Sequence, residues 1–261
     1  MVNSETVAGC KEDQKQHFFE KVSNFYCPFN FFLQIACKIL NTCTFFPMQG
    51  TEFMIITIAS LKGGVGKTTT AFHVAAYLQS LANTVLVDGD PNRSAIAWSK
   101  QTTSPSFKVI SEKQLPKYGS QFAHIVIDTQ ARPSNEDFAD LVDTSDLLVL
   151  PSPPTFLDLQ ALVETTEVLT SIGCKKHKVL LTKVPTNTGS TDERDAREFL
   201  EEQSIPVFKG RIRFYKAYEK AALNGTPVNL VKGDRNAAIA WADYKTVIEE
   251  ALEEVYASGK V

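Results

Sequence analysis

A glycine-rich loop with two lysines carries the clearest chemistry in this sequence. The loop reads Ser-Leu-Lys-Gly-Gly-Val-Gly-Lys-Thr-Thr from Ser60 to Thr69 and lies between an apolar β-like run and a helix-like run. A glycine loop at the start of a helix presents backbone N–H groups and the positive end of the helix dipole to an anion. Lys67 can then direct its charge at the β- and γ-phosphates of a nucleotide, and the Thr68 hydroxyl can hold Mg²⁺. The loop therefore predicts a triphosphate site formed by Gly63, Gly64, Val65, Gly66, Lys67, Thr68 and Thr69.

The loop departs from the ordinary P-loop pattern in a specific way. Leu61 stands where that pattern has glycine, and a second lysine, Lys62, precedes the glycine pair. A Lys-Gly-Gly-x-Gly-Lys-Thr-Thr string resembles the deviant P-loop of the ParA/MinD ATPases, most of all the small ParA-type partition proteins. The resemblance implies that ATP and Mg²⁺ bind, and that Lys62 reaches the nucleotide of a partner subunit in an ATP-sandwich homodimer. A cation there would stabilise the charge on the transferring phosphoryl oxygens, so Lys62 joins Lys67 among the predicted catalytic residues.

Two aspartates, Asp88 and Asp90, follow the second apolar run of this part of the chain. Carboxylates at the mouth of a strand can address metal-bound water and an attacking water, although the same residues also favour a turn with a helix N-cap. The string from Val85 to Arg93 resembles the Walker A′ motif of the same family. That resemblance implies that Asp90 orients the attacking water and that Asp88 supports the Mg²⁺ shell. The family usually has Gln-Gly where this chain has Asn92-Arg93, a departure that can alter the switch region.

A third apolar run, His124 to Asp128, ends in an aspartate in the manner of a Walker B motif. By resemblance, Asp128 would hold Mg²⁺ through a water molecule and couple to Thr68. Family members often continue with Pro-Pro or Pro-Ala one residue later, whereas this chain continues Thr129-Gln-Ala-Arg-Pro133. We interpret Arg132 in this loop as a solvated side chain rather than a phosphate contact.

Strand-like and helix-like segments alternate from Met54 onward. The β-like runs are Ile55–Ala59, Thr84–Val87, Ile125–Asp128, Leu147–Leu150 and Val179–Thr182. Segments with helical period include Thr68–Leu81, Leu157–Ile172 and Asp192–Glu202. Continuous apolar strands joined by helices predict an α/β fold, with a doubly wound and mainly parallel sheet that has helices on both faces. Ligands of such sheets bind at the carboxyl ends of the strands, which is where Leu61, Asp88 and Asp128 fall.

The tail from Arg235 to Ser258 has the spacing of one long amphipathic helix. Its predicted apolar side consists of Ala237, Ile239, Trp241, Tyr244, Val247 and Ile248. Its last turns, Ile248 to Tyr256, are acidic, whereas a MinD-like membrane anchor would be basic and amphipathic. We therefore do not expect the membrane to be a partner.

The segment from residue 205 to residue 235 is locally basic. It contains seven basic residues against Glu219 and Asp234, a balance of +5 in a chain of net charge −3. Such a run is usually a solvated helix face. However, the string from Arg213 to Val228 resembles the region of ParA proteins that binds DNA without sequence preference. The resemblance implies salt-dependent DNA contacts at Arg213 and Arg235, followed by Lys209, Lys216 and Lys232.

The first 53 residues differ from the rest of the chain and show no βαβ pattern. The apolar run from Phe31 to Phe46 is too short to span a bilayer, and no secretory signal pattern is present. Its polar residues would form one stripe on a helix, which permits a helix in a membrane interface or on a partner. We expect instead that residues 1–53 are an N-terminal extension that is either non-native or weakly structured, and that residues 54–261 form the ParA-like ATPase domain. Of five cysteines none has CxxC spacing, so we expect free thiols and neither zinc nor an iron–sulfur cluster.

These features together with the resemblance imply a Mg²⁺-dependent, ParA-like ATPase of the cytoplasm that associates with the nucleoid. It would dimerise with ATP, bind DNA non-specifically and position plasmid, chromosome or protein cargo while a ParB-like or other adaptor stimulates hydrolysis. The net charge of −3 excludes a globally basic nucleic-acid binder. Two alternatives stay open: a MinD-like membrane-associated spatial regulator, against which the acidic tail argues, and a nucleotide-binding scaffold that does not hydrolyse ATP. The presence of Asp90 and Lys62 argues against the scaffold.

Overall fold

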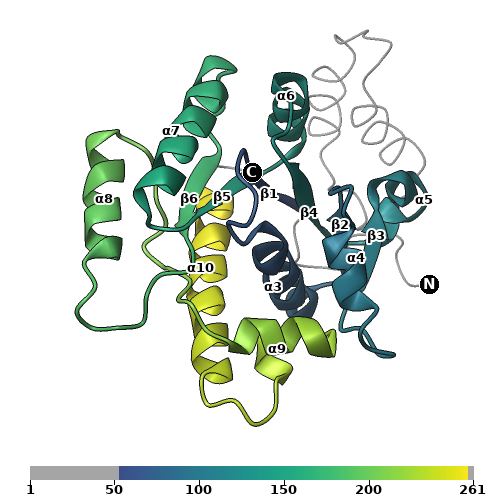
Figure 1. Ribbon diagram of the computed structural model, residues 1–261. Coiled ribbons are helices and arrows are strands. Elements are labelled where there is room, and N and C mark those ends of the chain that lie inside the picture. Colours follow the sequence, from purple (N-terminus) through teal and green to yellow (C-terminus); the bar gives the residue numbers. More distant parts are fainter. Residues whose placement is uncertain (1–52, 258–261) are drawn as a thin grey trace, which may run out of the picture.

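A six-stranded sheet with the strand order β3-β2-β4-β1-β5-β6 lies at the centre of the computed structural model (Figure 1). The structure describes residues 53–257, apart from the side chain of Asn135. Every pairing between neighbouring strands is parallel. The strands are β1 Met54–Ser60, β2 Thr84–Asp88, β3 Lys108–Ser111, β4 His124–Ala131, β5 Leu147–Ser152 and β6 His177–Leu181. This architecture confirms the predicted α/β class.

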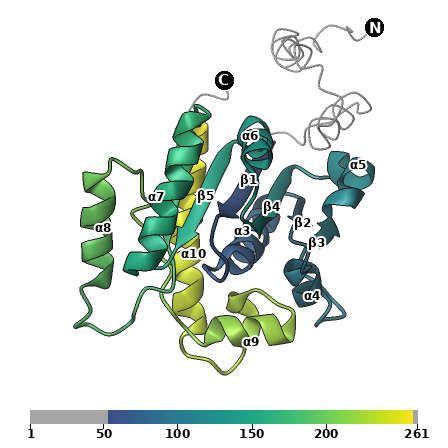
Figure 2. The same cartoon turned by 45° about the horizontal axis from the view of Figure 1, so that its top comes forward.

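Helices cover both faces of the sheet (Figure 2). They are α3 Lys67–Leu81, α4 Ser94–Ser99, α5 Leu115–Tyr118, α6 Asn135–Thr144, α7 Phe156–Ser171, α8 Asp192–Glu202, α9 Ala217–Asn224 and α10 Ala237–Ala257. Short 3₁₀ turns occur at η1 Glu112–Gln114, η2 Gly119–Gln121 and η3 Val228–Leu230. Among residues 53–257, no helix combines the length and the apolar character needed to cross a bilayer.

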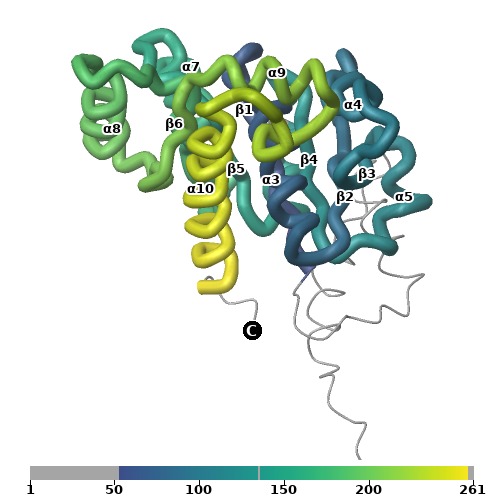
Figure 3. Tube along the Cα trace, turned by 90° about the horizontal axis from the view of Figure 1, so that it is seen from below, coloured from purple at the N-terminus to yellow at the C-terminus, as the bar shows by residue number. Residues whose placement is uncertain are grey.

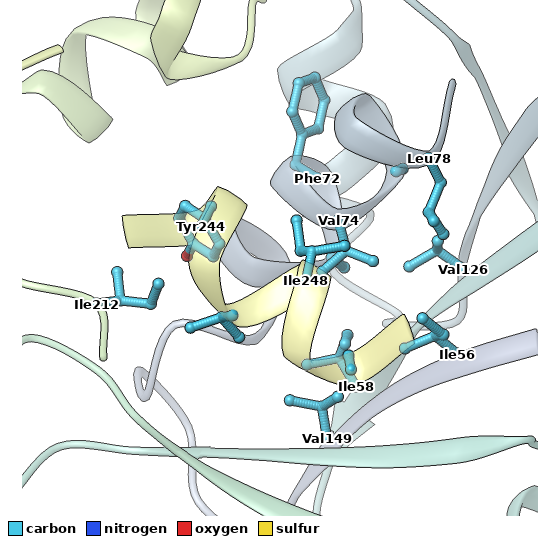
Figure 4. Close-up of a cluster of buried hydrophobic side chains, with 14 of the residues drawn as sticks. Ile56, Ile58, Phe72, Val74, Leu78, Val126, Val149, Ile212, Tyr244 and Ile248 are labelled. Atoms are coloured by element: carbon cyan, nitrogen blue, oxygen red, sulfur yellow. The ribbon is translucent and has the colours of Figure 1, made fainter. Parts of the chain in front are cut away.

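Two apolar clusters, one on each face, hold the layers together. Side chains of β1 and β4 meet those of α3 and α10 in one cluster, of which Figure 4 shows ten labelled members. The other cluster joins the sheet to α6, α7 and α8. Strand β2 serves both, because Leu86 points into the first cluster while Val85 and Val87 point into the second. All five residues of β2 are buried, as expected for a strand covered on both sides.

Helices α3 and α10 lie side by side on one face (Figures 1 and 3). The apolar stripe of α10 is Ala237, Ala240, Tyr244, Val247, Ile248 and Ala251, whose spacing follows the helical period. The predicted apolar side was wrong in one member, because Ile239 lies off this stripe and is 43% exposed. The helix itself begins at Ala237 rather than Arg235.

The sequence pattern did not predict β3, α4, α5, α6 or α9. Strand β3 is an edge strand of four residues, too short and too polar to show an alternating pattern. Helix α6 had a local signal, since Ser134 and Asp137 form a capping box in which each side chain bonds the backbone N–H of the other residue. The predictions for residues 1–52, including four of the five cysteines, lie outside the described residues. The fifth, Cys174, is a free and buried thiol.

Candidate active site

The glycine-rich loop connects β1 to α3 at the carboxyl edge of the sheet. Gly64 and Gly66 have φ angles of 77° and 97°, a left-handed conformation that favours glycine. Thr182 and Lys183, the residues that directly follow β6, bond the backbone of this loop. The Thr182 hydroxyl donates to the Val65 carbonyl at 2.7 Å, and the Lys183 ammonium donates to the Gly64 carbonyl at 2.6 Å. The sequence prediction did not include Thr182 and Lys183. Their position at a strand's carboxyl end was the signal that could have identified them.

Lys67 is the first residue of α3 and has only 7% of its surface exposed. Its ammonium donates to the Lys62 carbonyl at 3.2 Å. Burial lowers the pKa of Lys67, while the carboxylates of Asp128 and Asp90 counter that effect. The ammonium is therefore a desolvated cation at the start of a helix, and negative charge from a phosphate would stabilise its charged form.

Asp128 lies in β4 beside Asp88 of β2 and is fully buried. Neither carboxylate oxygen makes a hydrogen bond of ordinary geometry with a described residue, although the Thr68 hydroxyl is near enough to favour the charged form. Burial raises the pKa of Asp128 to about 7, and the Asp88 carboxylate adds to this rise. A buried carboxylate that lacks a hydrogen bond beside a hydroxyl fits a divalent cation.

The described residues contain no group of three or more His, Cys, Asp or Glu that could hold a metal ion. Mg²⁺ seldom needs such a group, because it usually binds one or two protein oxygens together with phosphate oxygens and water. Thr68 and Asp128 therefore suit Mg²⁺ that arrives with a nucleotide.

Asp88 and Asp90 lie where β2 turns into α4. The buried carboxylate of Asp88 accepts the N–H of Asp90 at 3.1 Å and the N–H of Ile96 at 2.9 Å. Asp88 therefore caps α4 from inside the sheet, which is the structural role that the sequence also allowed. Burial raises the pKa of Asp88. Asp90 is half-buried, and its carboxylate accepts the N–H of Asn92 at 2.8 Å.

Lys62 forms an ion pair that the sequence did not indicate. Its ammonium lies 2.5 Å from the Asp158 carboxylate, in the first turn of α7. The Thr155 hydroxyl donates to the other oxygen of that carboxylate at 2.5 Å. Beside this pair, Phe156 and Leu157 are each 68% exposed. Lys62 is therefore paired within its own chain, next to exposed apolar side chains.

The structure separates the five predicted DNA-contact residues. Arg213 makes a two-pronged ion pair with Asp243, at 2.6 Å and 3.0 Å. The backbone N–H of Lys209 donates to the carboxylate of Glu250. Glu250 lies seven residues after Asp243 in α10, which places it roughly 10 Å further along the helix. Arg235, by contrast, precedes the first turn of α10.

Ion pairs also change the charge balance of the basic segment. Three of its seven basic side chains form ion pairs: Arg211 with Glu193, Arg213 with Asp243, and Lys220 with Asp234. Lys216, Lys232 and Arg235 are exposed and have no ion pair with a described residue. The Lys220–Asp234 pair holds α9 against the loop before α10. Lys216 lies one turn before Lys220, and Lys232 and Arg235 lie on either side of Asp234, so we refer to Lys216, Lys232 and Arg235 together as the basic surface.

The chain is similar in sequence to known nucleotide-binding proteins. A family model described as the CobQ/CobB/MinD/ParA nucleotide binding domain matches residues 56–228. The "Maintenance of carboxysome distribution protein A" of Gloeobacter kilaueensis is 39% identical over 204 residues, covering 75% of this chain and 93% of the relative.

Two solved structures share the fold. An ATP complex of a McdA variant from Cyanothece has a TM-score of 0.61 at 17% identity, covering 81% of this chain and 99% of the other. A putative plasmid partition protein from Borrelia burgdorferi, bound to AMPPNP, has a TM-score of 0.59 at 18% identity, with 78% and 100% covered.

Proposed function

Because the chain belongs to the CobQ/CobB/MinD/ParA family of nucleotide-binding domains, we propose that it is a ParA-type ATPase that positions a cargo. Of the cargoes that the sequence left open, we favour a protein assembly of the carboxysome kind over a plasmid or a chromosome. The observation that carries this choice is the 39% identity to a carboxysome distribution protein over 93% of its length.

The residues at the carboxyl edge of the sheet have different roles in the binding and hydrolysis of ATP. The loop N–H groups and Lys67 bind and orient the β- and γ-phosphates. Thr68 and Asp128 hold Mg²⁺, which neutralises charge on those phosphates when bound. Asp90 orients the attacking water, and Asp88 sets the shape of the loop that carries Asp90, through its bonds to two backbone N–H groups.

The proposed dimer would give Lys62 a second partner. In the single chain its ammonium is paired with Asp158. In an ATP-sandwich dimer it would leave Asp158 and reach the phosphates of the facing subunit, where a cation stabilises the transition state. The exposed Phe156 and Leu157 would then be covered by the partner, which adds an apolar contribution to the dimer. Each dimer would present two copies of the basic surface to the DNA of the nucleoid in the cytoplasm. An adaptor would stimulate ATP hydrolysis, after which the dimer would separate and leave the DNA.

Sedimentation of the full chain tests this proposal. With a non-hydrolysable ATP analogue and Mg²⁺, the wild type should form dimers, and Lys62→Ala should not. The control is Lys175→Ala, which removes an exposed lysine at the opposite edge of the sheet. With ATP itself, Asp90→Ala should stay dimeric long after the wild type has returned to monomers, and its phosphate release should fall to background. Equal dimer yields for wild type and Lys62→Ala, or wild-type turnover by Asp90→Ala, would refute the assignment.

A further inference from the structure

Arg93 has a backbone conformation that is unusual for its residue type. It directly precedes α4, with φ 53° and ψ 41° in the left-handed region. Glycine adopts this conformation freely, whereas a side chain with a Cβ is strained there. Strain of this kind persists only where surrounding contacts hold the residue in place. Arg93 lies three residues after Asp90, so its conformation fixes the end of the turn that carries Asp90.

The side chain of Arg93 supplies those contacts. One terminal nitrogen donates to the Asp88 carbonyl at 2.5 Å and also to the Glu112 carboxylate. The other nitrogen, Nη2, donates to the second oxygen of Glu112 at 2.7 Å. A forked, charge-assisted pair of this type is among the stronger polar contacts in proteins and fixes direction as well as distance. It holds the pKa of Glu112 below its usual range.

The fork joins three elements at the carboxyl edge of the sheet. Asp88 ends β2, Arg93 precedes α4, and Glu112 begins η1 directly after β3. Strands β2 and β3 are neighbours, with Asp88 opposite Ser111, so Glu112 is presented by the adjacent strand. The turn from Asp88 to Arg93 is thereby tied at both ends to the sheet.

Asp90 lies between these two ties and has little freedom. Its N–H donates to the Asp88 carboxylate at 3.1 Å, and its carbonyl accepts the N–H of Arg93 at 2.9 Å. One of its carboxylate oxygens accepts the N–H of Asn92. Release of Arg93 would free one end of this turn, and a displacement of about 1 Å at a catalytic group can reduce a rate by roughly a hundredfold.

We propose that Arg93, through its fork with Glu112, acts together with Asp88 to position Asp90 for ATP hydrolysis. The inference rests on the proposed ATPase function. Arg93 acts through the loop and not on the nucleotide, so its loss should lower kcat and leave the binding of ATP unchanged.

The test compares kcat with nucleotide affinity in four variants of the full chain. Arg93→Gly keeps the loop conformation accessible but removes the fork, and Glu112→Gln removes its acceptor charge. Both should lower kcat for Mg-ATP about 10-fold or more while the Kd for a fluorescent ATP analogue changes less than about 2-fold. The double variant should be no slower than the slower single variant, because both changes break one interaction.

Arg132→Gly is the matched control. Arg132 is also an arginine with positive φ (57°) at this edge of the sheet, and its side chain has no ion pair with a described residue. Its replacement should leave kcat within about 2-fold of the wild type. Urea unfolding of each variant separates a loss of rate from a loss of folded protein.

The outcomes are distinguishable. If the wild type hydrolyses ATP in a manner that depends on Asp90, and Arg93→Gly and Glu112→Gln keep wild-type kcat, the positioning role is wrong and the ATPase function stands. A loss of affinity equal to the loss of kcat would likewise overturn it. If the wild type shows no turnover that depends on Asp90, the proposed function fails first.

Discussion

His73 shows how burial fixes the ionisation state of one side chain on α3, the helix that follows the glycine-rich loop. It is fully buried in α3, where Nδ1 contacts the Thr69 carbonyl at 2.7 Å and Nε2 accepts the N–H of Val228 at 3.0 Å. These contacts require a neutral ring with its proton on Nδ1. The ring also stacks on Tyr244 of α10 at 4.6 Å. One neutral histidine therefore connects the helix that follows the P-loop to η3 and α10.

The stability of the fold should depend on pH through His73. Burial lowers the pKa of His73 to about 4, whereas an unfolded histidine has a pKa of about 6.5. The unfolded state therefore binds the proton first as pH falls, so stability is full above pH 6.5 and decreases between pH 6.5 and 4. The total loss from this residue should be about 3 kcal/mol.

Urea unfolding of the wild type and of His73→Gln, measured from pH 7.5 to pH 4, isolates this contribution. Glutamine carries a donor and an acceptor but does not titrate. The difference in unfolding free energy between the two proteins should change steadily across the window from pH 6.5 to pH 4. Other carboxylates and histidines titrate in both proteins and cancel. A difference that is independent of pH would contradict the assignment of a neutral, buried His73.

At the scale of elements, the packing of α9 against the rest of the domain depends on one glycine. Gly225 ends α9 with φ 66°. A Cβ at this position would lie 2.6 Å from the backbone nitrogen of Thr102 and 2.9 Å from the backbone carbon of Gln101. The loop after α4 therefore approaches the end of α9 so closely that only glycine fits.

Gly225→Ala should destabilise the protein far more than the matched substitution Gly233→Ala. Gly233 has a similar φ of 73°, but a Cβ there would meet nothing within 4 Å. The control should lose about 1 kcal/mol from backbone conformation alone. The loss for Gly225→Ala should be at least about 3 kcal/mol, because the backbone near Thr102 must also move. Urea midpoints of the two variants measure the difference, and equal losses would show that the close contact carries no weight.

At the scale of the whole molecule, ion pairs within the chain decide which basic side chains could contact DNA in the proposed function. The sequence placed Arg213 first among the DNA contacts, together with Arg235. In the structure the guanidinium of Arg213 is already paired with the Asp243 carboxylate of the same chain. We therefore propose the basic surface, Lys216, Lys232 and Arg235, as the main DNA contact. An ATP-bound dimer would present this surface twice.

Binding of duplex DNA by the ATP-bound protein should be sensitive to salt and to Arg235. Each phosphate contact contributes a slope of about −0.9 in a plot of log affinity against log salt. Arg235→Ala should reduce the steepness of that slope by about 2, because the dimer loses two contacts. Fluorescence anisotropy on two duplexes of unrelated sequence measures this effect.

Arg194→Ala is the control for that titration. Arg194 is an exposed arginine of α8, away from the basic surface, and its replacement should leave the slope unchanged. Strong preference for one duplex, or an Arg235→Ala slope equal to that of the wild type, would contradict non-specific binding through this surface.

The sequence by itself determined the parts of this protein that are local in the chain. Ten consecutive residues, Ser60 to Thr69, specify a phosphate loop, because glycine conformations and a helix start depend only on near neighbours. The alternation of apolar runs with helical periods predicted five of the six strands and the α/β class. The position of Asp88 at the end of β2 followed from the same pattern. The predicted end of the next strand at Asp128 was wrong, because β4 continues to Ala131.

Only the tertiary structure decided which side chains distant in the chain meet. Thr182 bonds Val65 from 117 residues away, and His73 bonds Val228 from 155 residues away. Lys62 meets Asp158, Arg93 meets Glu112, and Arg213 meets Asp243. No local pattern encodes these pairs, because folding brings together residues that are far apart in the chain, both across the sheet and between the helices and loops that cover it. The tertiary structure therefore also decides how much charge each lysine and arginine can present to a ligand. Some of these side chains are paired with a carboxylate of the same chain, and others are left exposed.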